Sequence, residues 1–177
     1  ALTQYNDRVT LDGLKTTRDN LPNPPTAQVT ARKNLETLGT PVINTQKPSA
    51  TQIADRQDLE KKDAGQKTAY KKVPAKTNRT YATLQKAYTD AYWIYDTALK
   101  NYNTKYEKGD FAVTMTLKEL NTAVTNYTKY ETALKNYNIK YANNATTLSQ
   151  FSKQIEEYTK ANSLYSGKLS QYNATYK

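Results

Sequence analysis

The stretch DTALKNYNTKY at residues 96–106 recurs as ETALKNYNIKY at residues 131–141, with nine of eleven positions identical. The two copies lie 35 residues apart, and a degenerate third copy follows at the same step. The shared leucines and tyrosines are Leu99, Tyr102 and Tyr106; Leu134, Tyr137 and Tyr141; and Leu169, Tyr172 and Tyr176. Because 35 residues make five heptads, the repeat predicts helices with an apolar period of 3.5 residues.

The tyrosines follow this heptad period strictly. With Leu99 at position a, all fourteen tyrosines after residue 80 fall on a or d, whereas chance would place about four there. The pattern indicates amphipathic helices with a tyrosine-rich seam. We interpret the rings as core, with each hydroxyl reaching the wet edge of a slim bundle. A tyrosine-lined groove that stacks sugars or bases is the alternative.

Two interruptions of the seam divide the region into three helices. Gly109 is predicted to end the first helix in a left-handed conformation, with Asp110 as the N-cap of the second. Asn143–Asn144 is predicted to make the equivalent turn 35 residues later. Thr147 and Gln150 form a capping-box pattern for the third helix.

The expected helices are 79–107, 110–142 and 147–176. Short connections make successive helices antiparallel. The sequence therefore predicts an all-α protein whose centre is an antiparallel three-helix bundle, coiled-coil-like, with additional N-terminal helices packed on it. One continuous helical rod is the alternative if the interruptions are weak.

The first part of the chain has a less regular pattern. Leu2, Tyr5 and Val9 have helical spacing, and the prolines of residues 20–25 should end that helix. Further helices are expected at 26–38 and, opened by a Ser49–Gln52 capping box, at 49–72. We divide the chain into an irregular helical N-terminal region, 1–73, and the three heptad repeats, 74–177.

Several apolar residues lie off the seam. Trp93, Ile94 and Met115 occupy positions b and c and would be exposed on an isolated bundle. We expect residues 1–72 to cover them. The alternative is a partner-binding patch, because exposed apolar clusters often mark interfaces.

The composition argues against catalysis. The chain has neither cysteine nor histidine, which excludes a disulfide framework, a Cys/His metal site and a Ser–His–Asp triad. Its carboxylates are scattered, and no glycine-rich phosphate loop is present. We expect no enzyme activity, no cofactor and no metal. No apolar run reaches the roughly 18 residues that a membrane-spanning helix needs.

The net charge of +10 is concentrated in one segment. Residues 61–79 carry seven basic side chains and one acid: Lys61, Lys62, Lys67, Lys71, Lys72, Lys76 and Arg79. Such a surface attracts polyanions: nucleic acid, teichoic acid or another anionic polymer, or an anionic membrane. Nucleic acid is disfavoured because the tyrosines occupy the seam and not a face shared with the lysines. A solvated helix face that aids solubility is the other reading.

The cysteine-free helical repeats, rich in Lys, Thr, Asn and Tyr and carrying TALKNYN, resemble those of cell-surface or secreted proteins of Gram-positive bacteria, especially lactic acid bacteria. The resemblance covers residues 80–177. It implies an extracellular structural or adhesion module, of the adhesin-stalk or surface-layer type, located at the cell surface or wall. Its partner would be a wall polymer or another surface protein, and self-association remains open.

Overall fold

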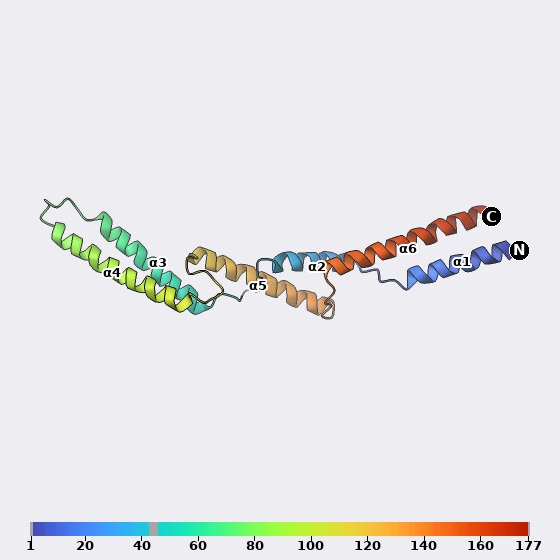
Figure 1. The fold of residues 1–177 in the computed structure, drawn as a ribbon, viewed down its shortest axis with the longest axis horizontal. Coiled ribbons are helices and arrows are strands. Elements are labelled where there is room, and N and C mark those ends of the chain that lie inside the picture. The colour runs from blue at the N-terminus through green and yellow to red at the C-terminus, as the bar shows by residue number, and fades with distance from the viewer. Residues whose placement is uncertain (1, 43–45, 177) are drawn as a thin grey trace. The chain divides into compact units, whose positions relative to one another are not determined.

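The computed structural model describes residues 2–42 and 46–176, and within them it contains helices and no strand. The helices are α1 Leu2–Asp19, α2 Thr26–Gly39, α3 Ala50–Lys71, α4 Tyr81–Tyr106, α5 Leu117–Lys140 and α6 Leu148–Thr175 (Figure 1). The all-α prediction is confirmed. The seam is interrupted where expected, so α4, α5 and α6 are separate helices and not one continuous rod.

The predicted capping boxes are partly confirmed. Thr147 and Gln150 exchange both hydrogen bonds of a capping box at the start of α6, and the Ser49 side chain accepts from the Gln52 amide at the start of α3. Of the predicted turn pair, Asn143 adopts a positive φ of 57°, beside Ala142 at 51°.

The prediction for residues 109–116 is wrong. Among the described residues no glycine has a positive φ, and α5 begins at Leu117 instead of following an Asp110 cap. Thr116 and Glu119 form reciprocal hydrogen bonds there: the Thr116 amide donates to Glu119 Oε2 (2.7 Å) and the Glu119 amide to Thr116 Oγ1 (3.2 Å). This local capping box selects the later start.

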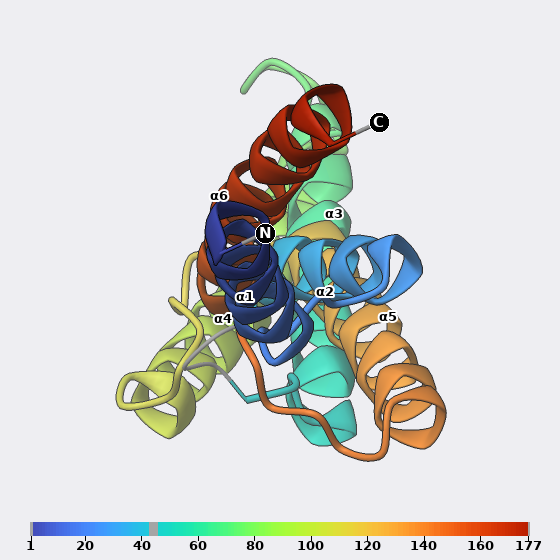
Figure 2. The same cartoon turned by 90° about the vertical axis from the view of Figure 1, so that its right-hand side faces the viewer.

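The helix pairing also differs from the expected three-helix bundle, which is not confirmed. The described helix–helix contacts are those of α3 with α4 and of α1 with α6. Figure 1 shows α3 along α4, and Figures 1 and 2 both show α1 beside α6. The seams of α4 and α6 therefore face α3 and α1, two helices from the first 72 residues. A heptad pattern identifies the apolar face of a helix but not the helix that covers it.

The chain divides into two compact units. One combines residues 1–38 with 132–177, and the other comprises residues 39–131. Each unit thus contains residues from both segments, 1–73 and 74–177, that the sequence analysis separates. Helix α5 contributes its first residues to one unit and its last residues to the other.

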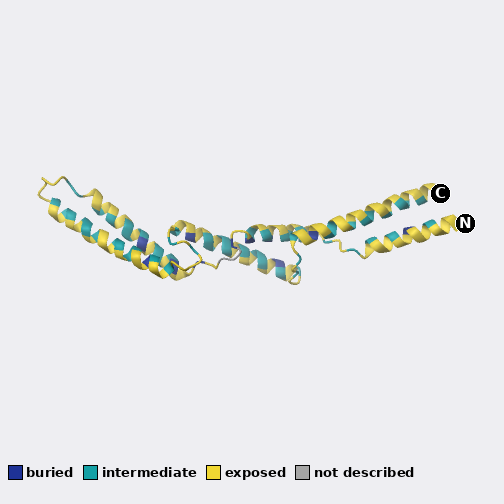
Figure 3. Cartoon of the chain, in the orientation of Figure 1, coloured by how far each residue is buried: buried dark blue, intermediate teal, exposed yellow. Residues whose placement is uncertain are grey.

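The core is thin, and Figure 3 shows how few positions are fully buried. The buried apolar side chains are Leu11, Leu35, Val42, Leu59, Tyr102, Leu120, Tyr137 and Phe151. Of the fourteen seam tyrosines, only Tyr92 is exposed, at 38%. Tyr102 and Tyr137 are buried and the others, apart from Tyr92, are half-buried, so the rings lie on the covered side of their helices. The expectation that each hydroxyl reaches the wet edge is wrong for Tyr102, Tyr137 and Tyr141, whose hydroxyls are buried without a hydrogen-bond partner. In the part of the chain that the structure describes, no helix is both long and apolar enough to cross a membrane.

Candidate functional site: three copies of one helix junction

The first 72 residues contain a second repeat, which does not follow the heptad period. A glutamine, an arginine, a leucine and an acid recur at a step of 24 residues. The members are Gln4, Arg8, Leu11 and Asp12; Gln28, Arg32, Leu35 and Glu36; and Gln52, Arg56, Leu59 and Glu60. The signal was visible in the sequence, but its period is not a multiple of seven, and the segments share few other residues.

The structure brings each copy of this 24-residue repeat to one copy of the 35-residue repeat. We name each pairing by its arginine. The Arg56 junction comprises Arg56, Leu59, Glu60, Tyr102 and Tyr106; the Arg32 junction Arg32, Leu35, Glu36, Tyr137 and Tyr141; the Arg8 junction Arg8, Leu11, Asp12, Tyr172 and Tyr176. The first lies in the unit of residues 39–131, and the other two lie in the other unit.

The three junctions share one arrangement of charge and aromatic rings. The guanidinium carbon lies 5.6, 5.7 and 6.0 Å from the ring centre of Tyr102, Tyr137 and Tyr172, respectively. Each of these rings is tilted against the tyrosine one turn later, with centroids 4.8–4.9 Å apart. The leucine is at most 3% exposed in every copy. Cation–π contact and leucine burial thus hold each helix pair together.

Each arginine also pairs with the acid four residues later on its own helix. The distances from Arg Nε to the carboxylate are 3.0 Å for Glu60, 2.9 Å for Glu36 and 3.3 Å for Asp12. In two junctions the same carboxylate accepts a hydrogen bond from the first residue of another helix. Glu60 Oε1 accepts from the Leu117 amide (2.7 Å) and Glu36 Oε1 from the Leu148 amide (2.8 Å).

These carboxylates sit at helix N-termini, where exposed amides and the helix dipole favour negative charge. The hydrogen bond from the Leu148 amide, followed by that from Arg32, lowers the pKa of Glu36. In the Arg56 junction the guanidinium additionally donates to the carbonyl of Val113, at 3.1 Å, in the segment that leads into α5. The acid therefore orients the start of α5 or α6, and in the Arg56 junction the arginine contributes as well.

A further carboxylate satisfies the second tyrosine in two of the junctions. Asp55 Oδ2 accepts from the hydroxyl of Tyr106 (2.7 Å), and Asp7 Oδ2 accepts from the hydroxyl of Tyr176 (2.8 Å). The equivalent residue in the Arg32 junction is Ala31. Accordingly, the Tyr141 hydroxyl is buried without a hydrogen-bond partner.

Lysine side chains form ion pairs with the same carboxylates. Lys105 Nζ lies 2.6 Å from Asp55, and Lys168 Nζ lies 2.9 Å from Asp7. Hydrogen bonds from the lysine first, and from the tyrosine second, lower the pKa of both aspartates. Burial, followed by its hydrogen bond to Asp55, raises the pKa of the Tyr106 hydroxyl.

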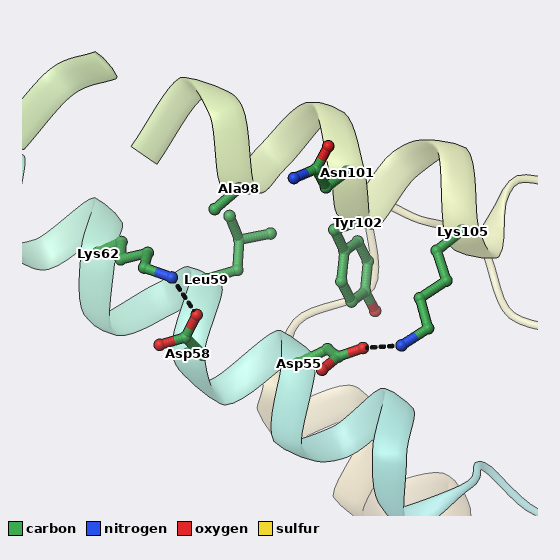
Figure 4. Close-up of a pocket in the computed structure, with 8 residues that line it drawn as sticks. All are labelled: Asp55, Asp58, Leu59, Lys62, Ala98, Asn101, Tyr102 and Lys105. Atoms are coloured by element: carbon green, nitrogen blue, oxygen red, sulfur yellow. Dashed lines mark hydrogen bonds and ion pairs between the residues drawn. The ribbon is translucent and has the colours of Figure 1, made fainter. Parts of the chain in front are cut away.

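A shallow pocket adjoins the Arg56 junction (Figure 4). It is lined by Asp55, Asp58, Leu59, Lys62, Ala98, Asn101, Tyr102 and Lys105. Its ionised side chains are paired with each other, Asp55 with Lys105 and Lys62 with Asp58. The hydroxyl of Tyr102, which also lines the pocket, is buried without a hydrogen-bond partner. Within the described residues, no three acidic side chains converge on a point that could hold a metal ion.

The predicted basic segment spans the last turns of α3 and the loop to α4. Two of its residues are neutralised on their own helix, because Lys62 pairs with Asp58 and Lys67 with Asp63. The others are exposed, and no ion pair is described for them: Lys61, Lys71, Lys72, Lys76 and Arg79. The structure thus leaves five cations without a described ion pair, four of them around the turn between α3 and α4 and Lys61 in the middle of α3.

The predicted apolar patch is only partly assembled. Trp93 and Ile94 are 58% and 57% exposed on α4, so the expectation that residues 1–72 cover them is wrong. Those residues cover the tyrosine seam instead. Met115 is half-buried and lines a different pocket, together with Phe111 and Tyr127. Trp93 lies edge-on to Tyr92, with ring centroids 5.6 Å apart.

The chain was compared with protein-family models, curated proteins and solved structures, and none of them matches it.

Proposed function

We propose that this chain is a non-enzymatic structural module whose helices are held in register by the repeated junction, and that it serves as a spacer or adhesion element at a bacterial cell surface. One observation carries the structural role: the same arginine, leucine and tyrosine contacts occur three times. The arginine, acidic and tyrosine side chains of the junctions take part in helix packing and helix capping, as we expect of a scaffold.

The surface location is supported by the sequence. Its Lys/Thr/Asn/Tyr-rich helical repeats resemble those of Gram-positive surface proteins. In that setting the chain would hold other parts of a protein at a fixed separation or present them to a partner.

Spin-label distances test the spacer role. Because the chain has no cysteine, pairs of introduced thiols label uniquely. We choose exposed sites: Thr16 and Ser163 within one unit, Gln57 and Thr104 within the other, and Thr77 with Gln171 between them. A spacer should give a narrow distance distribution for the third pair, comparable to those of the first two. A distribution as broad as that of a flexible linker of equal length would refute the spacer role.

A second candidate function is polyanion binding through the basic segment, favoured by the five exposed, unpaired cations. Many weak contacts between these side chains and a teichoic acid would give binding that weakens steeply with salt. Binding to isolated cell walls, with and without teichoic acid, measures it. Replacing the five cations by glutamine should weaken binding about tenfold or more at low salt.

The matched control for this experiment removes the same number of exposed, unpaired lysines elsewhere. Those residues are Lys108, Lys118, Lys129, Lys135 and Lys153. Equal losses in the two variants would show a general charge effect, and binding that survives both high salt and the segment variant would exclude the basic segment. Binding through the exposed Trp93 face should instead respond little to salt.

A further inference from the structure

The three junctions differ in how far the helix face that carries the arginine and the acid is covered. In the Arg56 and Arg32 junctions the arginine side chain is 14% and 18% exposed, but Arg8 is 57% exposed. The acids follow the same order, at 37% for Glu60, 39% for Glu36 and 56% for Asp12. The third junction therefore has the same residues in a more open environment.

Two further positions of the 24-residue repeat show the same difference. Gln52 is buried and Gln28 half-buried, whereas Gln4 is exposed. The next position is half-buried as Ile53 and as Val29 but is 66% exposed as Tyr5.

The opposite face of α1 is covered as in the other copies. Leu11 is 2% exposed, against 3% for Leu35 and 3% for Leu59. Helix α6 thus packs on α1 in the usual way, and only the second face is open. Leu2 and Val9, 73% and 53% exposed, add apolar side chains beside that face, at positions that are exposed in the other copies as well.

The covered junctions show what occupies this face. In each, the first turn of another helix lies there, with its first amide on the junction's glutamate. The two incoming helices begin alike: a threonine cap, a leucine at the first position, and a large apolar residue at the fourth. That fourth residue is fully buried in both cases, as Leu120 (0%) and Phe151 (3%).

We propose that the open face of α1, formed by Gln4, Tyr5, Arg8 and Asp12, is a docking site for the first turn of a further helix of this same type. The Asp12 carboxylate accepts the first amide of that helix, and Arg8 donates to a carbonyl of the segment before it. Tyr5, at the position of the half-buried Val29 and Ile53 in the other copies, covers its fourth, apolar residue. The inference rests on the structural role proposed above. The partner it identifies is a further helix of the same type, which would lengthen the module.

The reach of the chain supports this occupant. Tyr141 belongs to the Arg32 junction, and seven residues later Leu148 donates to Glu36 of that junction. Tyr176 occupies the equivalent place in the Arg8 junction, held there by Asp7. A segment that follows Tyr176 as residues 142–166 follow Tyr141 would therefore bring its first turn to Asp12.

The test joins a second copy of residues 142–166 to the full chain directly after Tyr176. A tether of this length holds the segment at millimolar effective concentration. We expect the first-turn amides of the added helix to exchange with solvent at least tenfold more slowly than in an unstructured chain. The amide signals of residues 4–12 should shift in the NMR spectrum of the same protein.

Two controls separate docking from helix formation alone. In one, lysine replaces the added copies of Leu148 and Phe151; in the other, Tyr5→Lys and Asp12→Lys are made in α1, where both side chains are exposed. Both should abolish the protection. Protection that persists in either control, or that never appears in the parent protein, would overturn the proposal. The spin-label and cell-wall experiments use the unextended chain, so their outcome is independent of this one.

Discussion

At the scale of single residues, tyrosine has two roles that phenylalanine could not combine. Its ring contributes apolar area to a thin core, and its hydroxyl reaches a carboxylate at the edge. Tyr106 and Tyr176 make this hydrogen bond, whereas the hydroxyl of Tyr141 is buried without a partner. The chain thus contains its own comparison between satisfied and unsatisfied copies of one position.

Replacing these tyrosines by phenylalanine should change the free energy of unfolding differently at the positions with and without a hydrogen-bond partner. Tyr106→Phe should lower the free energy of unfolding by about 1 kcal/mol, because it removes a hydrogen bond to a charged group. Tyr176→Phe should destabilise in the same direction. Tyr141→Phe should be neutral or stabilising, since it removes a buried hydroxyl that has no partner. Urea unfolding measures all three, and equal effects at all three positions would contradict the hydrogen-bond assignments.

Ala31→Asp should repair the unsatisfied copy. A carboxylate at this position, equivalent to Asp7 and Asp55, can accept from the Tyr141 hydroxyl and should stabilise the protein by about 1 kcal/mol. The gain should disappear when Tyr141→Phe is also present. A double-mutant cycle measures this coupling, and a gain that is independent of Tyr141 would indicate a general effect of helix charge instead.

At the scale of elements, the short helices of the first 72 residues position the long helices that follow. Helix α3 illustrates this, because its apolar periodicity is poor and yet it packs along α4. One buried leucine, an arginine over a tyrosine ring and a glutamate at a helix start replace a continuous apolar stripe. Such specific contacts fix which helix pairs with which, where a uniform seam would not.

Removing the acid of each junction should affect stability according to its contacts. Glu60→Ala and Glu36→Ala should each cost about 1 kcal/mol, because the first amide of α5 or α6 loses its acceptor and the helix dipole its compensating charge. Asp12→Ala should cost less, since Asp12 makes only an exposed pair with Arg8. Thermal and urea unfolding compare the three variants. An Asp12 effect as large as the others would mean that the ion pair, and not the helix start, is what matters.

At the scale of the whole molecule, the ionisable groups predict the pH range of stability. The pKa values of Asp7, Asp55 and Glu36 are lowered by hydrogen bonds in the fold. A lowered pKa means that the folded state binds fewer protons than the unfolded state, so stability is present above the unfolded values of 3.8 and 4.5 and falls as the pH drops through the folded values.

The alkaline side has the opposite sign. The pKa of Tyr176 is raised by its hydrogen bond to Asp7 and then by burial, and that of Tyr106 is raised too. Their stabilisation is present below about pH 10 and is lost as the pH rises through the folded values. With no histidine, the urea midpoint should be nearly constant between pH 6 and 8. A transition in that interval would contradict the prediction, and Asp7→Asn with Asp55→Asn should flatten the acid limb.

The local features of the fold could be predicted from the sequence. The tyrosine heptads gave α4 and α6 to within about two residues, and capping residues located the starts of α3 and α6. The heptad period also identified the helix face that is covered, on which all of the seam tyrosines but Tyr92 are buried or half-buried. These features depend on backbone hydrogen bonding and on the side of a helix that avoids water, and both are determined by neighbours in the sequence.

The choice of partners was decided only by the tertiary structure. The seam of α4 is satisfied by Leu59 and Arg56 on α3, a helix with little apolar periodicity of its own. At the start of α5, the local capping box of Thr116 and Glu119 sets the first residue, but the hydrogen bond from the Leu117 amide to Glu60, which is distant in sequence, forms only in the folded chain. Any apolar stripe can pack on any other of similar width, so which helices pair depends on the few charged and aromatic contacts formed when the whole chain folds.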